Sequence, residues 1–298
     1  MNLKVCLLGA VAFAASLAGC NPEKIEATVP GYIYMDSFAI DYPSPAESGR
    51  GAQKVTEAWV YVNDELHSVT PLPGIVPIPD VGNNQRISIG PGIRQNGIAA
   101  TRAEYPFYER YEVVLPEIKP DSTYNLQPKT RYTDAALFPY MEDFESSVVQ
   151  LDSVSSSSVN IHKESLNRDT EAYGRFVGKA VLTADKPGLK LASSELYALP
   201  KGGAPVYVEL DYKCNAEFIF GVIYQLPQQN PLDYPVVWIQ PTNRETGTPE
   251  WNKMYIELTP HVSSNLTALG FGFTLTASHD PSNTESVFYF DNLKIVHR

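Results

Sequence analysis

The sequence has few of the residues that build disulfides, metal centres or nucleic-acid-binding surfaces. It contains three cysteines and five histidines among 298 residues, and the histidines lack zinc-ligand spacing. Its 23 Lys and Arg face 34 Asp and Glu, so the formal net charge is −11, and no basic block is present. This balance argues against a nucleic-acid partner. The chain also lacks a Gly-x-Ser-x-Gly elbow, a phosphate-binding loop and a dinucleotide fingerprint, and we predict that it is not an enzyme.

Long apolar runs are also scarce, and the one that is present lies at the start of the chain. It follows the basic start Met1–Lys4 and extends from Val5 to Leu17. A membrane span needs about 20 apolar residues, so this run is too short for one. We predict that residues 1–19 are a secretory signal peptide, with a lone transmembrane helix as the alternative.

The last four residues of this segment, Leu17-Ala-Gly-Cys20, resemble the lipobox of bacterial lipoproteins. The resemblance implies cleavage before Cys20, a diacylglyceryl thioether on its sulfur and an acylated amine such as a palmitoyl amide. Residues 20–30 would then be the lipidated cysteine and a polar tether. Two or more acyl chains give stable anchoring. We therefore expect an exported protein, lipid-anchored to the bacterial cell envelope at the outer membrane. Cys214 would remain as a buried, unreactive thiol.

The rest of the chain has the composition of an all-β protein. It contains 18 Tyr, 12 Phe and 24 Pro, and short runs rich in Val, Ile, Tyr and Phe are separated by Pro, Gly, Asn and Asp. Strands are expected at 32–40, 58–62, 65–69, 86–89, 111–115, 124–126, 141–144, 174–182, 205–213, 216–225, 236–240, 253–258, 269–276 and 287–296.

Residues 31–135 are predicted to form a first β domain. Val60-Tyr-Val-Asn63 is followed by Pro77 and by Gly82-Asn83. This rhythm resembles small bacterial Ig-like or prealbumin-like modules, including the type called PEGA. The resemblance implies an Ig-like β-sandwich that acts as a spacer or docking module.

Residues 136–298 are predicted to form a second domain, a jelly-roll β-sandwich. Four segments carry the pattern: 141–145, 207–212, 251–258 and the closing strand 288–295. In this order they resemble the galactose-binding-like jelly roll of many carbohydrate-binding modules. Eight or nine short strands over this length suit that architecture.

The same resemblance implies a structural Ca²⁺ ion between the first and last strands of the jelly roll. Its ligands would be Glu145, or Glu142, together with Asp291 and backbone carbonyls. Oxygen-only ligation is what Ca²⁺ prefers. The alternative is that Asp291-Asn292 makes turn or cap hydrogen bonds.

A ligand platform is expected on the outer face of the second domain. Because strand side chains alternate, the segment 207–213 places Tyr207, Glu209 and Asp211 on one face. Aromatic rings can stack on a sugar while nearby polar groups take its hydroxyls. The candidate ligand-binding residues are Trp251, Tyr255, Tyr207, Glu209, Asp211 and, at a rim, Trp238. The alternative for Trp251 is that it holds the loop 246–250 against the sandwich.

The segment 92–108 carries two arginines and a dense group of aromatic residues. Arg94 and Arg102 could clamp an anionic group. The alternative, which we favour, is a long hairpin whose aromatics fill the gap between the two domains.

The pattern of acidic residues gives little indication of a catalytic site. Glu209 and Asp211 begin an alternating pattern that some jelly-roll glycosidases use, but Lys213 occupies the third position. We therefore predict non-catalytic binding of a polysaccharide or other glycan, with the lipid anchor as the membrane partner. The alternative is a structural or adhesion subunit that binds other envelope proteins, and a divergent glycosidase is a weaker alternative.

Overall fold

The computed structural model describes residues 29–41, 53–79, 82–165, 174–242 and 247–298. Strands are the main regular structure of these residues, with one short helix among them, α3 (Thr259–Ser264). The predicted all-β fold class is confirmed. Within the described part of the chain, no helix is long and apolar enough to cross a membrane. The predicted signal peptide and Cys20 lie outside the described residues.

The N-terminal strands pair only with one another. A five-stranded sheet has the order β4-β3-β6-β7, with β8 also paired to β6, and it accompanies the small sheets β5-β1-β9 and β10-β2. The strands are β1 (Gly31–Met35), β2 (Ala39–Ile40), β3 (Glu57–Val62), β4 (Glu65–Pro71), β5 (Gly74–Ile78), β6 (Gly82–Arg94), β7 (Arg102–Glu104), β8 (Tyr111–Ile118), β9 (Thr123–Leu126) and β10 (Lys129–Thr130). We call this part the N-terminal unit. Its identity as an Ig-like module stays a prediction.

The strands from Leu137 onward form a β-sandwich of two sheets. One has the order β13-β14-β21-β16-β19, with β11 also paired to β21, and the other has the order β12-β15-β20-β17-β18. We call them the six-stranded and the five-stranded sheet. The strands are β11 (Leu137–Glu142), β12 (Leu151–Ser153), β13 (His162–Ser165), β14 (Phe176–Leu182), β15 (Gly188–Ser193), β16 (Val206–Cys214), β17 (Phe218–Gln225), β18 (Leu232–Ile239), β19 (Asn252–Glu257), β20 (Gly270–Ser278) and β21 (Ser286–His297).

One apolar core lies between the two sheets. Alternate residues of each strand enter it, as the period of two requires. Phe220 of β17 and Phe273 of β20 stack with their ring centroids 5.7 Å apart, and Phe290 of β21 meets Phe218 from the opposite sheet at 5.3 Å. Each of these rings is at most 1% exposed. The inner faces are therefore fully used, and any ligand must bind an outer face or an end of the sandwich.

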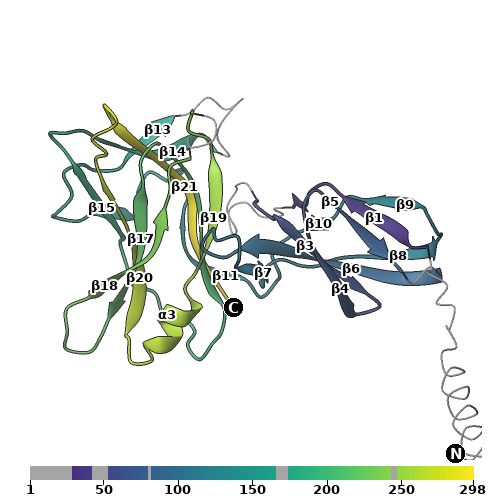
Figure 1. Cartoon of the computed structure of the whole chain (residues 1–298). Helices are drawn as coiled ribbons and strands as arrows, with labels where there is room; N and C mark the ends of the chain where they lie inside the picture. The colour runs from purple at the N-terminus through teal and green to yellow at the C-terminus, as the bar shows by residue number, and fades with distance from the viewer. Residues whose placement is uncertain (1–28, 42–52, 80–81, 166–173, 243–246) are drawn as a thin grey trace, which may run out of the picture.

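Most of the predicted strands are present, and the strands that were not predicted are β5, β7, β10, β12, β13 and β15. The segment between the predicted strands 141–144 and 174–182 contains β12 and β13, each at the edge of its sheet. Neither strand alternates apolar and polar residues, which is the signal used to find strands. Figure 1 shows that the N-terminal unit lies beside the sandwich, with the ends of β3, β6 and β7 directed at the side formed by β11, β19 and β21.

Candidate functional site

The predicted ligand platform exists as a shared face of the six-stranded sheet. On β16 and β19, Tyr207 pairs with Glu257, Glu209 with Tyr255, and Asp211 with Lys253. Residues directly opposite in an antiparallel pair have their side chains on the same face. The two strands therefore place these side chains on one common face of the sheet.

This face is not open to solvent, because the N-terminal unit covers it. Tyr207 is 4% exposed, and Tyr255, Glu209 and Asp211 are each at most 1% exposed. Gln95 donates a hydrogen bond to the Tyr207 hydroxyl at 2.6 Å, and the backbone amide of Asn96 donates to the Tyr255 carbonyl at 2.8 Å. In place of an open platform, the four side chains form an interface between the two parts of the chain, where no glycan can reach them.

A buried ion cluster lies at the centre of this interface. The Lys253 ammonium is 2.9 Å from Glu209 Oε2 and 3.3 Å from Asp211 Oδ1, and the Lys294 ammonium is 3.9 Å from Glu209 Oε2. From the N-terminal side, the hydroxyls of Tyr105 and Tyr132 donate to Glu209 at 2.7 and 2.8 Å. Glu209 therefore has two ammonium partners and two tyrosine donors, an environment that stabilises its anion.

The charges around Glu209 determine how this carboxyl titrates. Burial alone would raise the pKa of Glu209, but Lys253 and Lys294 outweigh it and lower that pKa from 4.5 to about 2. Burial lowers the pKa of Lys294 to about 8, against the opposing effect of Glu209. An acid with so low a pKa is poorly suited to donate a proton near neutral pH, so this carboxyl does not have the properties of a glycosidase general acid.

The pH dependence of folding should report this shift. Because the pKa of Glu209 is lower in the folded chain, its contribution to stability is fully present above about pH 4.5 and is lost as the pH falls toward 2. We expect the difference in unfolding free energy between the wild type and Glu209→Gln to shrink across this window. Urea titrations at several pH values measure it, and a difference independent of pH would contradict the assignment.

The aromatic hairpin behaves as the favoured alternative predicts. Tyr105, Phe107 and Tyr108 are each at most 4% exposed, and the Tyr105 ring lies 5.3 Å from that of Tyr207 and 4.8 Å from that of Tyr255. The aromatics therefore fill the space between the two parts of the chain, and this prediction is confirmed.

The two arginines of this hairpin do not form an open anion clamp. Arg94 Nε and Arg102 Nε lie 3.0 and 3.6 Å from Glu57 Oε1, and the Glu57 side chain is fully buried. Both guanidinium groups therefore neutralise a carboxylate of the N-terminal unit itself.

The two remaining predicted aromatics lie next to different sheets or on them. Trp251 directly precedes β19 and is half-buried, with its ring 6.4 Å from that of Tyr289. Trp238 lies on β18 of the five-stranded sheet and is 55% exposed. A single platform cannot include both, and Trp238 belongs to the face that the N-terminal unit leaves uncovered.

The outer face of the five-stranded sheet carries a row of registered side chains. Ile219 of β17 pairs with Trp238 on one side and with Thr276 of β20 on the other, and Thr276 pairs with Lys190 of β15. Neighbours along these strands, such as Phe218 and Leu275, enter the core. The row thus places one exposed indole beside an aliphatic side chain, a hydroxyl and an ammonium. We call this surface the Trp238 face.

A fixed carboxylate lies next to that row. Asp233 Oδ2 is 2.6 Å from the Lys190 ammonium, and Asp233 Oδ1 accepts a hydrogen bond from the Thr274 hydroxyl at 3.0 Å. Gly221 makes room for it, since a Cβ there would lie 2.5 Å from Thr274 Oγ1 and 2.9 Å from Asp233 Oδ1. No local pattern in the sequence predicts this group, because it depends on which strands become neighbours.

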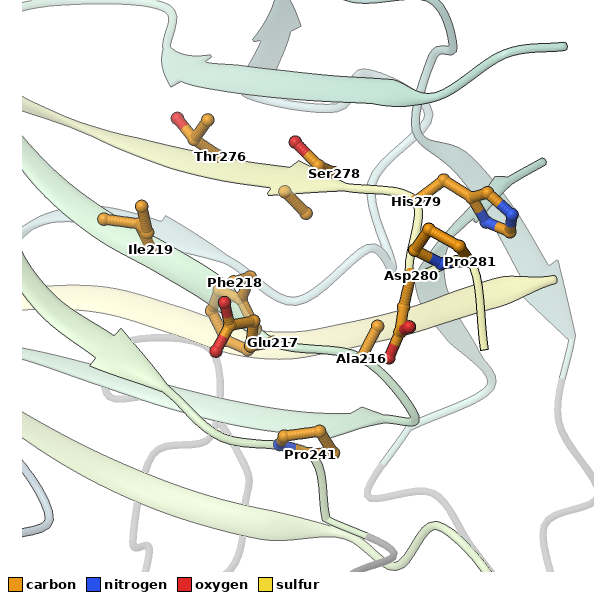
Figure 2. A pocket seen from close by; sticks show the side chains of 11 residues that line it. Ala216, Glu217, Phe218, Ile219, Pro241, Thr276, Ser278, His279, Asp280 and Pro281 are labelled. Carbon is orange, nitrogen blue, oxygen red and sulfur yellow. The ribbon is translucent and has the colours of Figure 1, made fainter. Parts of the chain in front are cut away.

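A pocket of about 440 Å³ lies at the end of the Trp238 face. Figure 2 shows its lining between the ends of β17 and β20, with Pro241 on the opposite side and the His279 ring turned away from Glu217. Ile219 and Thr276 line it and so connect it to Trp238. Hydrogen bonds from the Ser282 hydroxyl and amide lower the pKa of Asp280, which keeps this carboxylate ionised. Ile219 and the two prolines offer apolar contact, while hydroxyls and carboxylates offer hydrogen bonds.

The predicted calcium ligands already have partners within the chain. Glu145 accepts hydrogen bonds from the amides of Arg175 and Phe176, and its carboxylate pairs with the Arg175 guanidinium at 3.4 Å. Glu142 accepts from the amides of Phe144 and Gln150. Across the residues that the structure describes, no group of three or more His, Cys, Asp or Glu side chains is arranged to hold a metal ion.

Asp291, the remaining predicted calcium ligand, lies on β21 and is buried. Burial, together with the charges of Asp211, Asp143 and Glu145, raises the pKa of Asp291 well above its usual value. It accepts a hydrogen bond from the amide of Asn292 at 2.8 Å, as the turn alternative predicts. The side-chain atoms of these acids that could ligate a metal ion are all oxygens. A cation would have to compete with the Arg175 guanidinium for the Glu145 carboxylate.

The chain belongs by its fold to the all-β proteins built on a β-sandwich. No protein-family model matches it, and no curated protein matches it.

Solved structures of carbohydrate-binding modules resemble it at low identity. A Clostridium thermocellum xylanase fragment with a family 22 module, complexed with xylohexaose, aligns with 54% of this chain at 15% identity and a TM-score of 0.37. The alignment spans only 28% of that xylanase chain. A structure from work on promiscuous carbohydrate-binding modules of the β-sandwich superfamily aligns with 80% of this chain and 84% of its own, at 12% identity and a TM-score of 0.38. A family 61 module in complex with β-1,4-galactotriose aligns with 50% of this chain and 87% of its own, at 11% identity and a TM-score of 0.32. At these identities the likeness concerns the fold and says nothing about a ligand of this chain.

Proposed function

We propose that this is a lipid-anchored envelope protein whose sandwich binds a glycan, without cleaving it, on the Trp238 face. The observation that carries the proposal is the exposed indole of Trp238 in register with Ile219, which itself lines the pocket. A ring exposed to this degree costs free energy in water, and the apolar face of a pyranose can cover it. The nearby hydroxyls and carboxylates are suited to orient sugar hydroxyls.

The proposed anchor is the lipid on Cys20, which the lipobox-like sequence supports. It would hold the protein on the outer membrane through its N-terminal end. The N-terminal unit would then stand between the membrane and the sandwich, which fits a spacer role. Metabolic labelling with palmitate, in the wild type and in Cys20→Ser, tests the anchor independently of any glycan.

Trp238→Ala should weaken glycan binding at least tenfold. Most of the stacking area would be lost, while the exposed position makes a folding defect small. Affinity electrophoresis of the full chain against xylan, galactan and mannan measures this loss. Trp251→Ala serves as the control, because Trp251 lies outside the Trp238 face, directly before β19 of the six-stranded sheet. If binding is equally strong in Trp238→Ala, or is lost only in Trp251→Ala, the site is misplaced.

A protein partner is the second candidate, because one end of the sandwich exposes several leucines. Leu196, Leu266 and Leu269 are 41%, 63% and 67% exposed. Grouped apolar side chains of this kind can mark a protein interface. Capture of the same envelope protein by the wild type and by Trp238→Ala, together with no binding to any glycan, would favour this alternative.

We also propose a structural Ca²⁺ ion near Asp291, with Glu145 as its second side-chain ligand. The negative charges of Asp143 and Glu145, which help to raise the pKa of Asp291, support it, since a cation would offset them. EDTA should then lower the melting temperature of the full chain by several degrees, and added Ca²⁺ should restore it, because ligands that bind only the folded state stabilise it. A melting temperature insensitive to EDTA would count against the ion.

A further inference from the structure

The outer face of the six-stranded sheet continues beyond the part that the N-terminal unit covers. On this continuation, Tyr289 of β21 pairs with Lys213 of β16 and with Lys179 of β14, and Lys179 pairs with His162 of β13. Residues directly opposite in antiparallel strands share a face. Trp251 lies directly before Asn252, the residue that pairs with Tyr212, so it falls beside Lys213. We call these five residues the lysine–tyrosine row.

The side chains of this row contact one another around the ring of Tyr289. The Lys179 and Lys213 ammonium groups lie 5.5 and 5.6 Å from its centroid, both within cation–π range. The Trp251 ring approaches the same ring at 6.4 Å, with 57° between the ring planes. Two cations and two aromatic rings therefore form one surface.

This surface remains accessible, in contrast to the neighbouring ion cluster. The Lys179 side chain is 22% exposed, whereas those of Lys253 and Lys294 are 1% and 0% exposed. Tyr289 and Trp251 are half-buried, so parts of both rings face solvent. Figure 1 shows the β13–β14 end of the sheet away from the ends of β3, β6 and β7.

The charge of the row is unusual for this chain. The whole sequence has a formal net charge of −11, so its general field repels polyanions, and only a local cationic site can attract one. Neither lysine is without a partner in the chain. The Lys179 ammonium lies 3.0 Å from Glu164 Oε1, and this hydrogen bond raises the pKa of Lys179. Exposed pairs of this kind are weak, so an anionic ligand can compete with Glu164.

We propose that the lysine–tyrosine row is a second binding site, which takes an anionic polysaccharide whose pyranose units carry carboxylate or sulfate groups. The sugar ring packs against Tyr289 and Trp251, and its anionic group lies between Lys179 and Lys213. The site is on the opposite outer face of the sandwich from Trp238. It stands independently of glycan binding on the Trp238 face.

The test is affinity electrophoresis of the purified full chain in gels containing polygalacturonate, dextran sulfate or neutral galactan. We expect retardation by polygalacturonate, by dextran sulfate or by both, and the two polyanions separate a carboxylate from a sulfate ligand. Lys179→Gln/Lys213→Gln should weaken that retardation at least tenfold, and added salt should weaken it in the wild type. Trp238→Ala should leave it unchanged.

A charge-matched control tests whether polyanion binding depends on the lysine–tyrosine row or only on the net charge of the chain. Lys119→Gln/Lys186→Gln removes the same two charges from other exposed positions. Equal loss of retardation in this control and in Lys179→Gln/Lys213→Gln would overturn the proposal, as would the absence of retardation by both polyanions. Tyr289→Leu keeps both lysines and removes the ring, and unchanged binding to polygalacturonate and dextran sulfate in it would also overturn the site as described.

Discussion

Glu209→Ala should destabilise the folded protein by about 3 to 5 kcal/mol, because it removes a buried carboxylate that two buried ammonium groups share. Lys253 and Lys294 both lie within 4 Å of Glu209 Oε2, and their side chains are at most 1% exposed. The hydroxyls of Tyr105 and Tyr132 would lose their acceptor as well. Chemical denaturation of the full chain, followed by circular dichroism, measures the change.

Glu217→Ala is the matched control for this substitution. Glu217 follows β16 by a few residues but is exposed at the mouth of the pocket. Its removal should change the free energy of unfolding by no more than about 0.5 kcal/mol. If Glu209→Ala were as mild as Glu217→Ala, Lys253 and Lys294 would not depend on Glu209.

Tyr105→Ala is expected to have the second large effect, also about 3 to 5 kcal/mol. The Tyr105 ring contacts four other aromatic rings, with centroid distances between 4.7 and 5.3 Å. Removing it opens a cavity between the N-terminal unit and the sandwich. The single unfolding transition expected of the wild type should then separate into two, because the two parts lose their shared core.

Tyr105→Phe separates packing from hydrogen bonding at this position. It keeps the ring and loses only the hydrogen bond to Glu209, so we expect a cost of about 1 to 2 kcal/mol. Differential scanning calorimetry of both variants reports the size of each effect and the number of transitions. Equal effects in Tyr105→Ala and Tyr105→Phe would mean that the aromatic packing contributes little.

Strand periodicity made the faces of the sandwich predictable. The alternation in 207–213 correctly separates Val208 and Leu210, which enter the core, from Glu209 and Asp211 on the outer face. Local pattern is sufficient here because side chains alternate along any strand. The dense group of aromatic residues in 92–108, rather than any periodicity, correctly indicated an element that packs between the two parts of the chain.

The covering of that outer face could not be predicted from strand patterns. A polar outer face that meets water and one that meets a second unit have the same alternation. One available signal was Lys294, a charged residue within Leu293-Lys-Ile-Val296, where a buried lysine needs an acidic partner. The Asp233 group and the lysine–tyrosine row were missed because both depend on strand neighbours far apart in the sequence.

The burial of the interface also decides which form of the protein should be studied. A fragment of residues 136–298 would expose Tyr207, Tyr255 and the ion cluster to water, and their partners Tyr105 and Tyr132 would be absent. Binding measured on such a fragment could come from a face that is closed in the full chain. The full chain is therefore the proper subject for glycan screening.

The most direct measurement of the central claim is a fluorescence titration in which Trp238 is the only tryptophan. The chain has three, so Trp59→Phe/Trp251→Phe leaves Trp238 alone. Titration with neutral glycans only, namely xylohexaose, β-1,4-galactotriose and soluble neutral polysaccharides from bacterial envelopes, should give, for at least one of them, a saturable change in emission and protection from iodide quenching. If a glycan binds the protein while the emission and quenching of Trp238 stay constant, or if none of these glycans binds, the claim that the Trp238 face is a glycan site is contradicted.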